Sequence, residues 1–266
     1  MYQFKYQKVA SVADAAGILA KNADAKLMAG GQTLVASMKL RLAQPSDVLD
    51  LGGVAELRGI TVDAQGTATI GAMTRHVEVA TSKDILTVNP ALAALAGGIG
   101  DRMVRNMGTI GGSIANNDPA ADYPAAAVGL DAIINTSKRA IEADGFFLGM
   151  FETALGGGEI ITSIAFPKPK RAAYMKFKNP ASRYAIVGVF VAETPNGVRV
   201  AVTGAGPRVF RVTQMEAALA TKFAPDSVAN IKVPATGLNS DIHASAEYRA
   251  HLITIMAKRA VEAALK

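Results

Sequence analysis

The chain of 266 residues contains no cysteine and no tryptophan, and it has only three histidines. The lack of cysteine excludes disulfides, thiolate metal sites, iron–sulfur ligation and a cysteine nucleophile. His76, His243 and His251 are widely separated and do not show the spacing of metal ligands. We therefore expect no metal site and no catalytic acid–base residue on this chain, and any iron–sulfur chemistry must reside on another polypeptide.

Long hydrophobic runs are also absent. Half of the residues are apolar, yet no run reaches eighteen residues, and the first fifteen, MYQFKYQKVASVADA, lack the uninterrupted apolar stretch of a signal peptide. We expect a soluble, cytoplasmic protein without a membrane span. The net charge is +6, but the densest basic segment, PKPKRAAYMKFK, lacks the motif of a nucleic-acid module. We expect no nucleic-acid partner and interpret this segment as a solvated face or one that meets an anionic ligand.

The N-terminal part of the chain, residues 1–56, has the pattern of a β-α-β unit. Ser11 is followed by Asp14 in a capping-box arrangement that predicts the start of a helix. The segment AKLMAGG predicts a strand and a turn, and the spacing from Leu34 to Leu42 predicts a second helix before the strand DVLDL.

Two further segments follow. Residues 57–168 read as short strands joined by glycine turns, with a helix that begins at Asn89 and Pro90. The two prolines of FPKPKRAA mark a boundary, because they continue neither a helix nor a central strand. Residues 169–266 predict three strands, then two or three helices, the last of them over 245–266.

Three glycine-rich turns are candidates for a binding site: MAGGQTL at 28–34, GTIGGS at 108–113 and LGGGE at 155–159. Glycine leaves backbone N–H groups uncovered, so two such turns facing each other can hold a diphosphate. Neither G-x-G-x-x-G nor a Walker A motif is present. Taken singly, each turn is better explained as a tight turn of a compact fold.

A second candidate is the pair Asp118 and Asp122, which would share one face if they lay on a helix. Pro119 between them favours a capping and turn role instead. Ser37 and Ser113 have no nearby histidine and no nucleophile-elbow context. The residues alone thus indicate an anion or nucleotide cradle without hydrolytic machinery.

The segments AGGQTLVASMKLRLAQPSDVLDL at 29–51 and RNMGTIGGSIANNDPAADYPAA at 105–126 together resemble the FAD-binding medium subunit of molybdenum hydroxylases, of the carbon monoxide dehydrogenase and xanthine dehydrogenase type. GEIITSIAFP, KFKNPASRYAIVGV and AEYRAHLITIMAKRAV extend the resemblance over the whole chain. It implies an α+β protein: a two-subdomain FAD-binding fold of the vanillyl-alcohol oxidase type over 1–56 and 57–168, followed by a small C-terminal domain of antiparallel sheet plus helices over 169–266.

The resemblance also implies a set of FAD-binding residues. They are Leu27, Met28, Ala29, Gly30, Gly31, Gln32, Thr33 and Leu34 around the first motif; Thr109, Ile110, Gly111, Gly112, Ser113 and Asp122 in and after the second; and Ile99, Ile160, Ile161, Lys178 and Tyr184 elsewhere. Tyr184 would lie against the isoalloxazine ring and Lys178 would place a cation near it, although both also suit ordinary strand positions. Gln32 stands where relatives often have His or Asn, and Ser113 where they often have Asn.

With no cysteine and no histidine near either motif, the FAD is expected to be noncovalent. The resemblance implies that electrons from molybdopterin on a large subunit pass through 2Fe-2S clusters on a small subunit to this FAD, and then to an external acceptor. A heterotrimer, or a dimer of heterotrimers, would result. Two alternatives stay open: a self-sufficient flavin-dependent oxidoreductase acting on a small molecule, and a non-enzymatic nucleotide-binding or scaffold module.

Overall fold

The N-terminal segment forms a parallel three-stranded sheet in a computed structural model that describes all 266 residues. Its strands, in the order β1-β3-β2, and its two helices are β1 (Lys5–Lys8), β3 (Asp47–Asp50), β2 (Lys26–Met28), α1 (Val12–Lys21) and α2 (Leu34–Lys39). Ser11 caps α1 as predicted, since its hydroxyl accepts a hydrogen bond from the Asp14 N–H at 3.0 Å. The helix predicted to reach Leu42 ends at Lys39 instead, because Arg41 adopts a left-handed φ of 59°.

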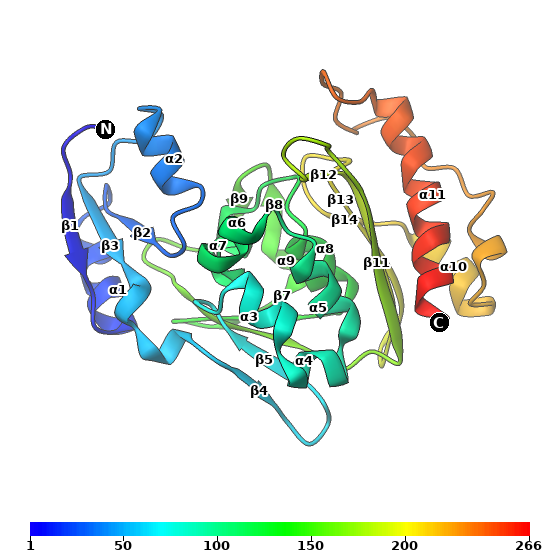
Figure 1. Ribbon diagram of the computed structural model, residues 1–266, viewed down its shortest axis with the longest axis horizontal. Coiled ribbons are helices and arrows are strands. Elements are labelled where there is room, and N and C mark those ends of the chain that lie inside the picture. The colour runs from blue at the N-terminus through cyan, green and yellow to red at the C-terminus, as the bar shows by residue number, and fades with distance from the viewer.

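The middle segment contains a five-stranded antiparallel sheet with helices packed on it (Figure 1). In spatial order its strands are β4 (Ile60–Val62), β5 (Ala68–Gly71), β10 (Ile161–Phe166), β6 (Ile133–Thr136) and β7 (Ala140–Glu142). Six helices lie between β5 and β6: α3 (His76–Thr81), α4 (Lys83–Val88), α5 (Pro90–Gly97), α6 (Arg102–Met107), α7 (Ile110–Asn116) and α8 (Tyr123–Gly129). Asn89 begins α5 as predicted, accepting a hydrogen bond from the Leu92 N–H at 3.1 Å.

Shorter elements connect these parts. They are the 3-10 turns Leu51–Gly53 and Ala55–Leu57, the helix α9 (Ala143–Phe146), and the hairpin of β8 (Phe147–Gly149) and β9 (Glu152–Thr153). The hairpin is fastened to the end of α7, where the Asn117 side-chain amide donates to the carbonyls of Gly149 and Glu152 at 2.8 and 2.7 Å. Asn117 itself has a left-handed φ of 43°, which ends α7.

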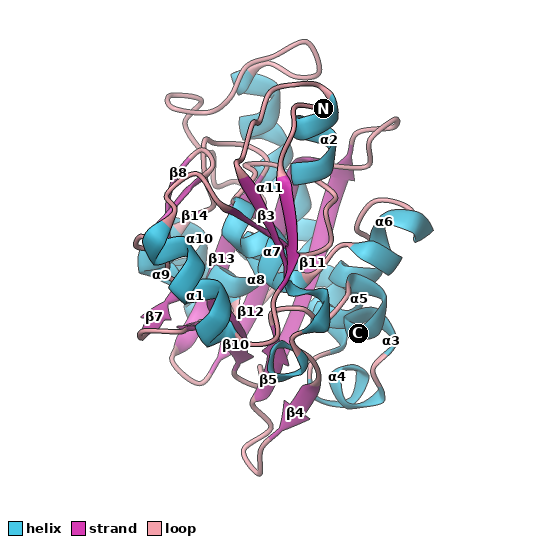
Figure 2. Ribbon diagram, turned by 90° about the vertical axis from the view of Figure 1, so that its left-hand side faces the viewer, coloured by secondary structure: helices cyan, strands magenta, loops and turns pink.

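The C-terminal segment is a four-stranded antiparallel sheet with helices on one face. Its elements are β11 (Arg171–Lys178), β12 (Ala185–Thr194), β13 (Gly197–Thr203), β14 (Phe210–Arg211), α10 (Thr213–Thr221), the 3-10 turn Pro225–Ser227 and α11 (Ala246–Ala264). Val189 and Val191 of β12 pack with α10 and α11, while Phe190 and Ala192 of the same strand belong to the core around α5 and α8. This sheet therefore has both faces buried and separates two cores. Figure 1 shows α5 and α8 on one side of the sheet and α11 on the other, and Figure 2 shows strands β11, β12 and β13 side by side.

The predicted α+β architecture is confirmed by these sheets and helices. A third, smaller core lies between the parallel sheet and α1. None of the helices is both long and apolar enough to span a bilayer.

Candidate functional site

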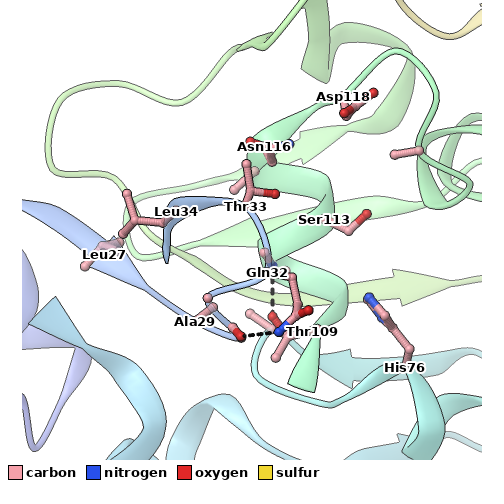
Figure 3. A pocket seen from close by; sticks show the side chains of 18 of the residues that line it. Leu27, Ala29, Gln32, Thr33, Leu34, His76, Thr109, Ser113, Asn116 and Asp118 are labelled. Carbon is pink, nitrogen blue, oxygen red and sulfur yellow. Dashed lines mark hydrogen bonds between the residues drawn. The ribbon is translucent and has the colours of Figure 1, made fainter. Parts of the chain in front are cut away.

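A cavity of about 740 Å³ lies between the N-terminal sheet, α7 and the loop that precedes β12. Its size falls within the roughly 300–1,000 Å³ usual for cofactor sites. Most residues of the predicted set line it: Leu27, Ala29, Gly30, Gly31, Gln32, Thr33, Leu34, Ile99, Thr109, Gly111, Gly112, Ser113, Asp122, Ile160, Ile161 and Tyr184. The fold thus brings together two motifs that are almost eighty residues apart in sequence (Figure 3).

The first motif is a turn between β2 and α2 with uncommitted hydrogen-bond donors. Gly31 has a φ of 70°, a conformation that favours glycine. The five consecutive backbone N–H groups from Gly30 to Leu34 donate to no acceptor within the chain. Gln32 folds back over the turn, with its Nε2 3.3 Å from the Gly30 carbonyl. A run of free N–H groups on a tight turn is an anion-binding concavity, so this loop has the chemistry that a diphosphate needs.

The two glycine motifs are in direct contact. A Cβ placed on Gly30 would lie 2.1 Å from the Met107 carbonyl oxygen and 2.8 Å from the Gly108 Cα, so only glycine permits this approach. A Cβ on Gly112 would lie 3.4 Å from the Cβ of Ala29 on the opposite loop. The absence of a side chain at Gly30 therefore allows the first loop to pack against the second motif.

The second motif is the start of a helix, so its interpretation as a glycine-rich turn is wrong. Thr109 caps α7, and its hydroxyl accepts from the Gly112 N–H at 3.1 Å (Figure 3). The preceding N–H groups are also engaged: Ile110 donates to Thr74 at 3.0 Å and Gly111 to Ala72 at 2.9 Å. A Cβ on Gly111 would lie 2.5 Å from that of Ala72. Helix capping and packing thus account for the composition of this segment.

Asp122 lies in the cavity wall just before α8, and its carboxylate is held by partners from β11. It accepts a hydrogen bond from the Tyr174 hydroxyl and another from the Lys176 ammonium at 2.9 Å. Burial raises the pKa of Asp122, whereas Lys176 and the Tyr174 hydroxyl act in the opposite direction. Because both carboxylate oxygens are engaged and Asp118 and Asp122 share no helix, the paired-carboxylate hypothesis is wrong.

The loop that joins α7 to α8 is braced by the C-terminal sheet. The Thr203 hydroxyl lies 2.6 Å from the Ala121 carbonyl, and the Gly204 N–H donates to the Pro119 carbonyl at 2.8 Å. Asp118, in this loop, accepts from the Ala120 N–H at 2.9 Å and faces the cavity. Burial raises the pKa of Asp118. Burial, with Asp118 nearby, also raises the pKa of the half-exposed Tyr184 at the cavity edge.

One wall of the cavity is apolar except for a single histidine. The residues that the segment 72–104 contributes are Ala72, Met73, His76, Ile99, Gly100 and Val104. His76 is buried, and burial, reinforced by the Arg105 guanidinium, lowers its pKa to about 4. Its imidazole is therefore neutral at pH 7. Sequence reasoning missed this residue, because a lone histidine has no motif that distinguishes a cavity wall from a core.

Three residues of the predicted set lie outside the cavity wall. Met28 ends β2, Ile110 is the fully buried first residue of α7, and Lys178 is exposed at the end of β11. A bulge between Phe177 and Lys178 shifts the register of β11 against β12. The buried cation from this strand is Lys176.

The lining also includes residues that the sequence interpretation did not name as FAD contacts: Lys26, Ser37, Ala43, Leu51, Ala72, Met73, His76, Gly100, Val104, Gly108, Ala115, Asn116, Asp118, Ala121, Phe151, Leu155, Glu159, Ser182 and Arg183. Glu159 closes the third glycine turn: it accepts from the Gly156 N–H at 2.8 Å and from Arg139 at 3.1 Å. The hydrogen bond from Arg139, aided by Gly156 and Thr136, lowers the pKa of Glu159 to about 2. The third glycine turn is thus held by the side chain of Glu159, its last residue.

The cavity fits a dinucleotide such as FAD on three structural grounds. It has the volume of a cofactor site, a loop of free N–H groups that suits the diphosphate, and an apolar wall that suits a flat ring system. These features define the class of protein as one that binds a dinucleotide, in a cavity lined by both the N-terminal and the middle segment.

Comparisons with known proteins agree with this class. Residues 2–169 match the family model described as the FAD binding domain in molybdopterin dehydrogenase, and residues 172–264 match the model for the CO dehydrogenase flavoprotein C-terminal domain. The chain therefore belongs to the family of FAD-binding medium subunits of molybdenum hydroxylases, as the sequence resemblance predicted.

Two curated relatives match almost the full length of the chain. The carbon monoxide dehydrogenase medium chain of Hydrogenophaga pseudoflava is 34% identical over 98% of this chain and 97% of its own. The nicotine 6-hydroxylase medium subunit of Paenarthrobacter nicotinovorans is 34% identical over 97% and 95%. Among solved structures, carbon monoxide dehydrogenase from Hydrogenophaga pseudoflava lacking the Mo-pyranopterin moiety matches with a TM-score of 0.90 at 35% identity, over 99% of this chain and 98% of that one.

Proposed function

We propose that this chain is the FAD-carrying electron-transfer subunit of a molybdenum hydroxylase complex. Its partners would be a small subunit with 2Fe-2S clusters and a large molybdopterin subunit, in a heterotrimer or a dimer of heterotrimers. When bound, FAD would supply the redox chemistry of the chain by accepting electrons from the iron–sulfur subunit and releasing them to an external acceptor. Membership of the family supports this assignment, as do relatives named as a carbon monoxide dehydrogenase medium chain and a nicotine 6-hydroxylase medium subunit.

The observation that carries the proposal is the run of free N–H groups from Gly30 to Leu34 at the edge of the cavity. These donors would hold the diphosphate of FAD. The apolar wall of Ile99 and Val104 and the ring of Tyr184 would enclose the flavin and exclude water from it. The work of the chain is then binding and orientation, with no residue required to form a covalent bond to the cofactor.

One observation favours a second candidate function. Asp118 is a partly buried carboxylate that faces the cavity, has no cationic partner, and has a pKa raised by burial. A self-sufficient flavin-dependent oxidoreductase would need such a group as a base. Under that reading, candidate substrates would reduce FAD on the isolated chain, and Asp118→Asn would abolish the reduction.

Two measurements test the primary proposal. The full chain, mixed with FAD and freed of excess, should retain about one FAD per chain, released as free flavin on denaturation. A chain that retains no flavin contradicts the proposal. In the assembled complex, the substrate of the large subunit should reduce this flavin, whereas the isolated chain with the same substrate should not. Equal reduction in both preparations would support the second candidate instead.

A further inference from the structure

His76 occupies an unusual position in the cavity wall. It is only 5% exposed, and it is the one polar side chain among the residues that the segment 72–104 contributes to the wall. The ring lies 5.3 Å from that of Tyr123, centroid to centroid, and Arg105 is the charged group that acts on it. Buried polar groups in folded proteins nearly always have hydrogen-bond partners, so a histidine in this place calls for one.

Neither nitrogen of His76 has a hydrogen-bond partner within the chain. Nδ1 is sealed from solvent and unpaired, whereas Nε2 is not sealed off and faces the cavity beside Gly108. A Cβ on Gly108 would lie 2.5 Å from Nε2, so the glycine makes room for this edge of the ring. An unpaired buried acceptor is less costly than an unpaired buried N–H, which places the proton of the neutral ring on Nε2.

The donor therefore points into the cavity, and the other residues that the segment 72–104 contributes to the lining are apolar. The free N–H groups of the first loop already suit the diphosphate, and Gly30 of that loop packs against Gly108. A ring system lying on Ile99 and Val104 would present its carbonyl oxygens or ring nitrogens to the single donor in that wall.

We propose that His76 Nε2–H donates a hydrogen bond to the flavin half of the bound FAD and anchors the ring at the apolar wall. This inference rests on the proposed function, because it requires FAD in the cavity. It adds a cofactor-binding residue from the start of α3, a segment outside both glycine motifs.

The test compares FAD binding by the full chain and three variants. His76→Phe keeps a ring but removes the donor, His76→Gln keeps an N–H donor, and His251→Phe alters an exposed histidine on α11 as a control. Loss of one neutral hydrogen bond should weaken FAD binding about 3- to 10-fold in His76→Phe. His76→Gln should retain most of the affinity, and His251→Phe all of it. Binding of ADP, which lacks the flavin, should be the same in all four proteins.

A spectroscopic readout is independent of affinity. His76 is the only buried histidine of the three, so its Nε2–H resonance in a ¹⁵N-histidine-labelled chain can be assigned with His76→Gln. Addition of FAD should protect this proton from exchange, and addition of ADP should not.

Three results would each overturn the assignment of His76. They are unchanged FAD affinity in His76→Phe, equal weakening of ADP and FAD binding in that variant, and no FAD-dependent protection of the Nε2 proton. If the unaltered chain binds no FAD, the proposed function fails and this inference fails with it; if it binds FAD normally, only the role of His76 is at stake.

Discussion

The two glycine motifs have similar composition but differ in what their backbones do. In the loop from Gly30 to Leu34, successive N–H groups are left without partners. In the segment from Thr109 to Gly112, the N–H groups of Ile110, Gly111 and Gly112 are all consumed by Thr74, Ala72 and the Thr109 hydroxyl. Glycine in the first motif leaves donors free for a ligand, whereas in the second it allows a helix to begin in a crowded position. Composition alone does not distinguish these roles.

The largest expected loss of stability comes from breaking the Asp122–Lys176 ion pair, which lies just after the second motif. Asp122→Asn leaves the Lys176 ammonium, whose side chain is 9% exposed, without its anion. Removing one partner of a buried pair costs about 3–5 kcal/mol of unfolding free energy. Urea denaturation of the FAD-free chain should show this loss, and Asp122→Asn combined with Lys176→Met should recover much of it. Equal stability of Asp122→Asn and the unaltered chain would mean that the pair is not formed.

A smaller loss of stability should follow from filling the space at Gly111. The added methyl group of Gly111→Ala would meet Ala72 at 2.5 Å, and overpacking of this kind costs about 1–3 kcal/mol. Gly145→Ala is the matched control, because a Cβ there meets nothing within 4 Å. Urea denaturation without FAD separates the two variants. A Gly111→Ala chain of normal stability that binds FAD poorly would instead show that the second motif acts directly on the cofactor.

In the first motif, a substitution of glycine should weaken FAD binding rather than lower stability. Gly30→Ala places a methyl group 2.1 Å from the Met107 carbonyl oxygen and forces the loop of free N–H groups away from the second motif. FAD affinity should fall at least about 10-fold, a loss of about 1.4 kcal/mol. Gly17→Ala in α1, where a Cβ meets nothing within 4 Å, should leave FAD affinity unchanged. Titration of flavin fluorescence measures both, and normal binding by Gly30→Ala would refute the diphosphate role of the loop.

The smallest effect concerns the third glycine turn. The pKa of Glu159 is lowered to about 2, against about 4.3 in an unfolded chain, so its contribution to stability is present above about pH 4.3 and is lost as the pH falls towards 2. Arg139 is more than half exposed, and solvent screening keeps the contribution below about 1 kcal/mol. Glu159→Gln should flatten the dependence of unfolding free energy on pH over this range. If Glu159→Gln loses stability at low pH just as the unaltered chain does, other carboxylates are responsible for that loss.

The features that sequence reasoning predicted well are those encoded by neighbouring residues. The helix starts at Ser11 and Asn89 depend on a side chain and an N–H three residues apart, so they can be read from local sequence. The turn around Gly31 is likewise local, because it follows a strand and requires a residue that tolerates positive φ.

The features that were missed depend on contacts between distant segments. Asp122 is paired with Tyr174 and Lys176, which are 52 and 54 residues away, so no local pattern could show that its carboxylate is occupied. The position of Lys178 depends on a bulge in the pairing of β11 with β12. His76 reaches the cavity only because α3 packs beside Gly108, a glycine in another part of the chain.

The C-terminal sheet has one face in each of two cores, so the two parts of the chain that the family models divide near residue 170 share one of those cores. Phe190 packs so closely on α8 that a Cβ on Gly129 would lie 2.9 Å from its ring, and the sheet also fastens the loop that carries Asp118 and Asp122. If the part of the chain after residue 170 were replaced by that of a relative, both faces of the C-terminal sheet would have to fit their cores. The loop that lines the cavity and the C-terminal half are thus joined through this shared sheet.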